Sequence, residues 1–412
     1  MKSLRIGICA LAAFSVLAFG AVEVWSQTVL EIGVALLFLW WAVLIFRKPE
    51  VEIRWSPLYW PLLIFVGLVT TELLFRTTAY GFYTRVALLE LSACLLLFFL
   101  SGQVYRERRE LRFLAWFLMW FVFAVAVFGI AQNLTSNDKL YWMRPLTAGG
   151  SPFGPYVNRN HFAGLMELLS PIGLSLLLFR GVRREQMPLV GLLTIVPVAA
   201  LFLSGSRGGI VSFLFELGLL TLLVRYRKIE KLHKAAVAVV LLTALAAVGW
   251  LGTNKLVERF TQVRSDDVSL ERRWTMFVST RHVFQHNPLI GTGLGTLADV
   301  YPRYETYYDG KIVDHAHNDY AELLAETGIA GGLCGLAFFW LFFREGWARL
   351  GAEQSSFSLG LHAGAIAACS GMLVHSLVDY NLHILSNGLL FLLMASLAAT
   401  PVLPPRTRVP SA

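Results

Sequence analysis

The chain has 412 residues, of which 56% are hydrophobic and only 15% are charged. A soluble protein would carry about 25% charged residues, so the composition excludes an ordinary soluble enzyme and predicts an all-α polytopic membrane protein. The formal net charge of +8 does not indicate nucleic-acid binding, because most basic residues gather in alternate loops between apolar stretches, as the positive-inside rule requires.

Long apolar stretches follow one another along most of the chain. A helix that spans a bilayer needs about 20 mostly apolar residues, and about twelve stretches meet this requirement. The first could be a cleaved signal peptide, but its apolar region is long for that role, so we expect a retained anchor. The expected spans lie near residues 4–24, 29–46, 58–75, 84–100, 113–131, 162–180, 188–204, 208–224, 235–251, 320–343, 359–378 and 385–400.

The basic residues also give the spans an orientation, with the N-terminus inside and the long polar loop outside. We therefore expect five parts of the chain. They are N-terminal spans in 1–131, spans with polar outer loops in 132–251, a large outer loop with amphipathic helices in 252–319, C-terminal spans in 320–400 and a cytoplasmic tail in 401–412.

The first polar stretch on the outer side covers residues 132–160. It is rich in Pro and Gly, which break helices, and it ends in the cluster Asn158-Arg159-Asn160-His161. Asn160 could simply cap the next helix. Alternatively, Asn160 and His161 belong to a functional site at the membrane edge.

The turn at residues 204–209 places Arg207 at or near the outer surface. Glycine lets the backbone approach a ligand closely, and N–H groups at a helix start favour anions. Arg207 is therefore a candidate anion-binding residue, with a tight turn and a snorkelling arginine as the alternative. Glu167 and Glu216 lie within expected spans, where carboxylates are costly and often functional.

The outer loop 252–319 is expected to contain helices that lie along the membrane surface, at 257–260 and 271–284. Arg272 and Arg273 point about 100° apart on such a helix, so at most one faces a site. The segment 288–295 is a glycine-rich turn rather than a dinucleotide site, because no clear strand precedes it. The apolar stripe of the second helix consists of Trp274, Phe277, Val278, Arg281 and Phe284.

Two histidines, His315 and His317, close the outer loop where it meets the next span. Their spacing is a weak signal for a metal, and we expect neither a metal nor a cofactor. Helix capping and interhelical hydrogen bonding are the preferred interpretation for a polar set that the last two spans bring to the same side. This set consists of His375, Asp379, Asn381 and His383.

The concentrated polar chemistry thus lies on the outer face, in Asn160, His161, Arg207, Arg273, His317 and Asp379. No nucleotide-binding motif is present, so an enzyme acting there must use an activated substrate, such as a lipid-linked pyrophosphate sugar. Arginines can hold its phosphates bidentately and replace a divalent metal. An imidazole can accept the proton of an attacking hydroxyl.

The chain resembles the O-antigen ligase and polymerase superfamily of bacterial polytopic membrane glycosyltransferases. The resemblance covers about residues 155–335. It rests on the motifs at 158–164 and 204–209, on Arg273 upstream of 288–295, and on His317-Asn318 running to Gly328 and Gly331. One departure is Phe277, which stands where the family often has tryptophan.

The resemblance implies a GT-C-like helical fold in the bacterial inner membrane, with a periplasmic loop between spans nine and ten that caps the site. His317 would be the catalytic histidine, while Arg207 and Arg273 would hold the donor pyrophosphate. Arg272 is the alternative to Arg273. The other candidate substrate-binding residues are Asn160, His161, His315 and Asn318.

The implied reaction is a metal-independent, inverting transfer of a glycan from undecaprenyl pyrophosphate to an acceptor hydroxyl. Ligases use lipid A core as the acceptor, polymerases use another repeat unit, and a third branch glycosylates proteins. The motifs do not separate these, and we expect transfer to lipid A core. A lipid-glycan transporter or flippase is the alternative from another class, although the cytoplasmic half offers no matching polar path for Glu167 and Glu216.

Overall fold

The computed structural model describes residues 1–47, 52–135, 139–146, 150–227, 242, 270–308 and 310–402. Within these ranges the chain forms thirteen α-helices and no sheet. The expected span 235–251, the expected helix at 257–260 and most of the tail 401–412 lie outside the described residues.

Every expected span within the described residues overlaps a helix, although the first, near 4–24, is shorter than expected because its helix ends at Leu17. Eight helices are long and apolar enough to cross a membrane, and two further apolar helices, α3 and α14, are shorter. The bounds are α1 (Lys2–Leu17), α2 (Val24–Phe46), α3 (Tyr59–Phe75), α4 (Gly81–Val104), α5 (Arg108–Thr135), α6 (Arg159–Leu178), α7 (Met187–Ser204), α8 (Arg207–Tyr226), α10 (Leu270–His286), α11 (Leu297–Val300), α12 (Asp319–Ala352), α13 (Ser356–His375) and α14 (Leu385–Ala399).

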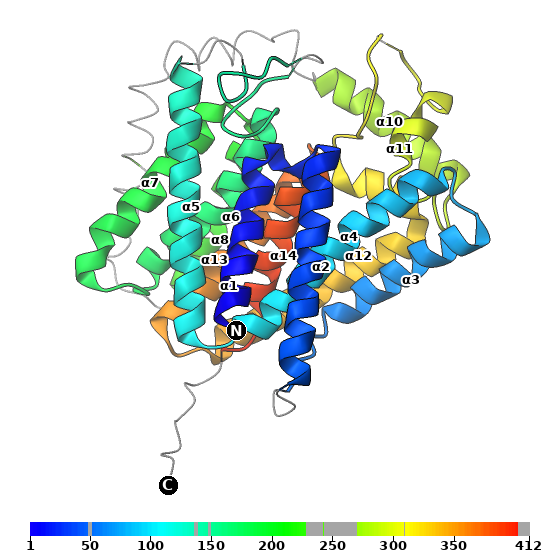
Figure 1. Ribbon diagram of the computed structural model, residues 1–412. Helices are drawn as coiled ribbons and strands as arrows, with labels where there is room; N and C mark the ends of the chain where they lie inside the picture. The colour runs from blue at the N-terminus through cyan, green and yellow to red at the C-terminus, as the bar shows by residue number, and fades with distance from the viewer. Residues whose placement is uncertain are drawn as a thin grey trace.

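Helix α6 lies inside the bundle (Figure 1), and almost none of its side chains is exposed. It packs against α5, α7, α8, α13 and α14. Helices α6 and α13 pack closely at Gly364, where an added Cβ would lie 2.3 Å from Oγ of Ser175. Small residues let membrane helices pack this tightly. A helix surrounded by protein can present polar residues at its start to an interior site.

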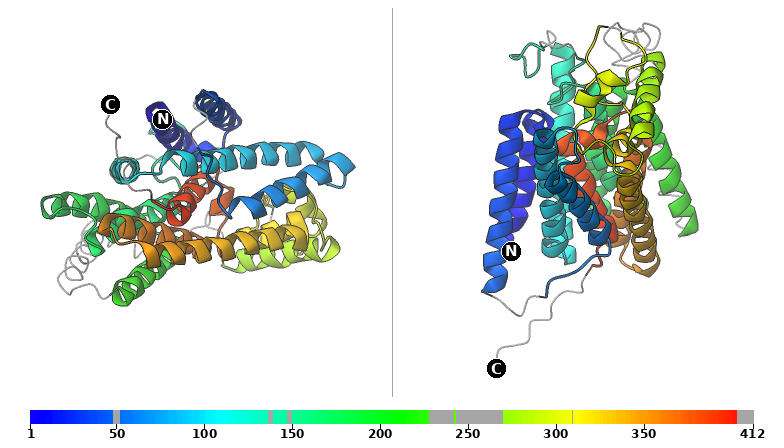
Figure 2. Two further views of the ribbon diagram at one scale, coloured as in Figure 1. Left: turned by 90° about the horizontal axis from the view of Figure 1, so that it is seen from below. Right: turned by 90° about the vertical axis from the view of Figure 1, so that its right-hand side faces the viewer.

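The helices of the outer loop lie at one end of the bundle. In Figure 1 and in the right panel of Figure 2, α10 and α11 lie at the end opposite the N-terminus. The predicted orientation requires this arrangement, since it puts the N-terminus and the outer loop on opposite sides of the membrane.

The glycine-rich segment 288–295 packs backbone to backbone against a kink in α12. At the kink, Gly328 has φ +60°, and the amides of Gly293 and Ile329 donate to the carbonyls of Glu326 and Pro288, each at 2.8 Å. A Cβ on Gly328 would lie 2.4 Å from the carbonyl carbon of Leu289. The segment is therefore the turn that we expected, and its glycines serve packing.

The buried face of α10 differs from the predicted apolar stripe. Its buried side chains are Met276, Ser279, Thr280 and Val283, whereas Trp274 is 66% exposed. The helix is packed against α12, and Ser279 accepts the backbone N–H of Thr306. The residues at three-to-four spacing were expected to lie along the membrane surface, and the exposure of Trp274 leaves that expectation open.

Candidate functional site

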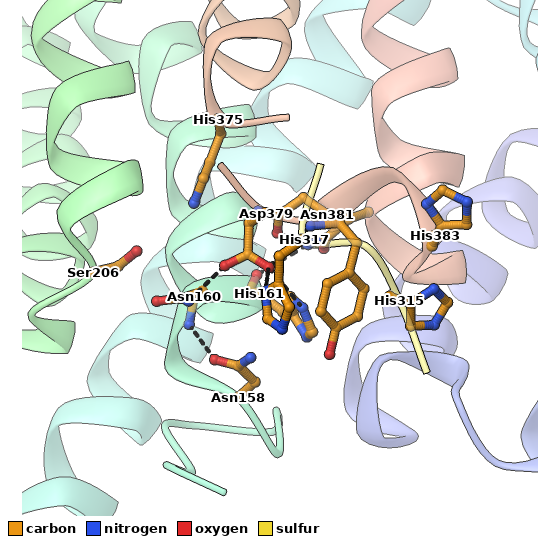
Figure 3. A network of polar contacts seen from close by, with 12 residues as sticks. Asn158, Asn160, His161, Ser206, His315, His317, His375, Asp379, Asn381 and His383 are labelled. Carbon is orange, nitrogen blue, oxygen red and sulfur yellow. Dashed lines mark hydrogen bonds and ion pairs between the residues drawn. The ribbon is translucent and has the colours of Figure 1, made fainter. Parts of the chain in front are cut away.

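A fully buried carboxylate, Asp379, lies at the centre of the polar network in Figure 3. It follows α13 in the turn before the short helix at Asn381–His383. Nδ1 of His317 lies 3.2 Å from Oδ1 of Asp379, and the side-chain amide of Asn160 donates to Oδ2. The backbone N–H of Tyr380 also donates to Oδ1, at 2.9 Å.

Two further basic side chains surround this carboxylate. Nη2 of Arg273 lies 3.7 Å from Oδ2, and Nε2 of His161 lies 3.9 Å from Oδ1. Burial alone would raise the pKa of Asp379. The hydrogen bond from His317 and the positive charge of Arg273 outweigh burial and hold that pKa well below its ordinary value.

The ionised state of Asp379 determines the tautomer of His317. A carboxylate can only accept a hydrogen bond, so Nδ1 of His317 carries the hydrogen that faces Asp379. The lone pair of the neutral ring is then on Nε2. His317 is oriented to accept a proton at Nε2 while Asp379 stabilises the resulting charge.

The backbone of His317 adopts a left-handed conformation, with φ +50°, which side chains other than glycine adopt rarely. The next residue, Asn318, caps α12 by accepting the N–H of Ala321 at 2.9 Å. Its amide group also donates to the carbonyl of Leu377 at 2.9 Å. The oxygen and the nitrogen of the Asn318 side chain both bind backbone groups. Asn318, a predicted substrate-binding residue, therefore holds the neighbouring His317 backbone in place.

The start of α6 supplies the other side of the network. Asn158, not Asn160, is the helix cap, since its side chain accepts the N–H of Asn160 at 2.9 Å. The side chain of Asn160 can therefore reach Asp379. A Cβ on Gly164 would lie 2.3 Å from Oδ1 of Asn381, so this glycine lets the turn after Asp379 pack against α6.

Tyr380 lies between the histidines of the site. Its ring centroid is 4.7 Å from that of His161 and 4.8 Å from that of His317, and it stacks on His315 at 4.3 Å. Burial, followed by the charge of Asp379, raises the pKa of its phenol. The sequence analysis did not predict a place for Tyr380 in the site. The only local feature that could have indicated one is that Tyr380 directly follows Asp379 in the sequence.

The start of α8 lies beside this network. Arg207 is the first residue of the helix and is exposed, while Ser206 caps it by accepting the N–H of Gly209 at 3.2 Å. A Cβ on Gly208 would lie 2.7 Å from Nε2 of His375. Of the two candidate arginines in α10, Arg273 is the one beside Asp379.

The carboxylate of Glu167 has a buried partner. Nδ1 of His375 lies 3.0 Å from Oε1 and 3.1 Å from Oε2 of Glu167, and both side chains are buried. Glu216 is directed at α13, where a Cβ on Gly371 would lie 2.0 Å from its Oε1. It is therefore packed against α13.

His315 and His317 point into different clusters. His317 contacts Asp379, whereas Nδ1 of His315 lies 2.7 Å from Oε1 of Glu322. In Figure 3 the rings of His315 and His383 lie together, away from Asn160, and their centroids are 5.2 Å apart. The two histidines of the sequence motif therefore do not share a ligand.

Comparison with known proteins agrees with the resemblance. Residues 192–336 match the O-antigen ligase family, Wzy_C. No curated protein matches the chain. The similarity to that family covers this segment of the chain, and eight of the described helices are long and apolar enough to cross a membrane.

The matched segment contains only part of the network. It includes Arg207, Arg273 and His317 but neither Asn160 nor Asp379. The match covers the positions of the first three without testing what each residue does, so their roles stay predictions. The carboxylate at the centre comes from the chain beyond that segment.

Proposed function

We propose that this protein transfers a glycan from undecaprenyl pyrophosphate to an acceptor hydroxyl at the periplasmic face of the inner membrane. The observation that carries the proposal is the pair of His317 and Asp379, with Arg273 Nη2 3.7 Å from the same carboxylate. An imidazole and a fixed positive charge thus lie beside one carboxylate, which supports a role for His317 as the base.

The chemistry follows from these groups. The acceptor oxygen attacks the anomeric carbon while its proton passes to Nε2 of His317, and the bond from that carbon to the pyrophosphate oxygen breaks. Asp379 stabilises the imidazolium that forms. Attack from the face opposite the leaving group inverts the anomeric configuration.

Arg273 and Arg207 stabilise the charge on the departing pyrophosphate. A guanidinium stays protonated at any relevant pH and binds phosphate through two parallel N–H donors. Such preorganised charge can contribute several kcal/mol to the transition state. The transfer therefore proceeds without a divalent metal at the pyrophosphate.

Lipid A core is the proposed acceptor, which makes the protein a ligase. A repeat-unit polymerase and a protein-glycosylating enzyme would use the same groups on another acceptor. A flippase would not need a base on the outer face, and the Glu167 carboxylate that it would use is paired with His375.

The test is transfer in detergent, with undecaprenyl-pyrophosphate glycan as the donor and EDTA present. Lipid A core and a second lipid-linked repeat are offered in parallel. We expect product on lipid A core, lost in His317→Ala and Arg207→Ala and retained in His286→Ala, a control on the exposed side of α10. Longer lipid-linked chains would establish a polymerase instead. No transfer to either acceptor would overturn the assignment.

A further inference from the structure

A second cluster of titratable side chains lies beyond Tyr380 and is not used in the proposed transfer. It joins His315 to Glu322 of α12 and His383 of the short helix before α14. Oε1 of Glu322 lies 2.7 Å from Nδ1 of His315 and 3.4 Å from Nε2 of His383. The three donor atoms all lie within 4.8 Å of one another.

Neighbouring groups orient two of these donors. Nδ1 of His383 lies 2.6 Å from Oδ1 of Asp319, so Nε2 of the neutral ring presents its lone pair to the cluster. Oε2 of Glu322 accepts the N–H of Ala316 at 2.8 Å, which leaves Oε1 facing the histidines. Histidines that bind metals are held in the same way, with the second ring nitrogen donating to a carboxylate.

One separation in the cluster already matches the spacing of two ligands around a small divalent ion. With bonds of about 2.0–2.1 Å, two ligands of a tetrahedral ion are about 3.3–3.4 Å apart. The distance between His383 and Glu322 is 3.4 Å. The distance between His315 and Glu322 must lengthen from 2.7 Å, and the His315 side chain, at 31% exposure, is the least constrained of the three.

The cluster lines a cavity of about 620 Å³. Further carboxylates line the same cavity, and no lysine or arginine does so among the residues that the structure describes. The excess of negative groups favours a cation. The open volume leaves room for water or a ligand oxygen at a further coordination position. These carboxylates are Glu90, Asp314, Asp319 and Glu326.

We propose that His315, Glu322 and His383 bind a divalent transition-metal ion, with Asp319 as the positioning residue for His383. Two imidazoles, one carboxylate and an open position form a donor set that suits Zn²⁺. The site is separate from the arginines and from His317, so it does not depend on the proposed transfer reaction. Its presence is compatible with transfer in EDTA.

The test is metal binding by the full chain in detergent, after removal of any affinity tag and of bound metal. Zn²⁺ is titrated against a chromophoric chelator, and Co²⁺ is used as a spectroscopic probe. We expect one Zn²⁺ per chain. Asp319→Asn should weaken binding about 10–100-fold, the usual effect of losing such a positioning group, and Glu322→Gln and His383→Ala should weaken it further.

The matched control is His286→Ala, which should bind Zn²⁺ as the wild type does. His282 and His286 are one helical turn apart on α10. They are therefore the pair of histidines at which a metal ion could bind adventitiously instead. Loss of binding in His286→Ala, or retention of binding in both Glu322→Gln and His383→Ala, would overturn the proposal. If a variant does not fold, the wild-type protein alone still tests the proposal. A wild-type protein that binds no Co²⁺, and therefore develops no visible absorption bands, would overturn it.

Discussion

Nδ1 of His317 lies 3.2 Å from Oδ1 of Asp379, a residue 62 positions further along the chain. The contact joins the loop before α12 to the turn after α13. A second bond supports it, since the N–H of Asp319 donates to the carbonyl of Ser376 at 3.0 Å. The orientation of the proposed base thus depends on two helices meeting at their outer ends.

Asp379→Asn should lower glycan transfer by about 10²–10⁴-fold, because an amide no longer selects the tautomer of His317 or stabilises its charged form. The measurement is the initial rate with lipid A core as the acceptor. Because the two residues act as a unit, His317→Ala combined with Asp379→Asn should be no slower than His317→Ala alone. Fully multiplicative losses would show that the residues act independently.

The same pair predicts how stability depends on pH. The folded protein holds the pKa of Asp379 below its ordinary value, so this group contributes stability above its unfolded pKa and loses it as the pH falls through the folded pKa. The free energy of unfolding of the wild type relative to Asp379→Asn should be constant above about pH 5 and should decrease at more acidic pH. Unfolding in detergent, followed from pH 8 to pH 3, measures it. A difference that grows on acidification would contradict the assigned charge.

The two adjacent arginines of α10 should differ in their effect on transfer. Arg273→Ala should lower the rate by about 10²–10³-fold, as loss of a preorganised charge does, whereas Arg272→Ala should change it by less than about tenfold. The measurement is the single-turnover rate at saturating donor, which separates a slower transfer step from a loss of donor affinity. The reverse order of effects would place Arg272 at the pyrophosphate.

Gly164→Ala should destabilise the protein by about 1–3 kcal/mol, the usual cost of forcing an extra methyl group into a packed interior. The added Cβ would lie 2.3 Å from Oδ1 of Asn381 and 3.0 Å from Nδ2 of Asn387. Gly191→Ala is the control, because a Cβ there would have no neighbour within 4 Å. Thermal unfolding of both variants measures the difference, and equal melting temperatures would show that Asn381 moves aside at little cost.

The amino-acid sequence by itself determined the helical class and most span positions, and it predicted candidate residues for a site. Apolar runs of span length require helices whatever their neighbours, because a backbone in lipid must satisfy its hydrogen bonds internally. Arg207, Arg273 and His317 were found as one set from local motifs, and the family match over residues 192–336 includes all three.

Only the tertiary structure decided which of these groups meet. Asn160 and Asp379 are 219 positions apart, and no local pattern links them. The side chains of His315 and His317 contact different carboxylates, Glu322 and Asp379, although the two residues are only two positions apart and the backbone at His317 is left-handed. The physical reason is that side-chain partners depend on how α6, α12 and α13 pack, and that packing is set by contacts along the whole length of each helix.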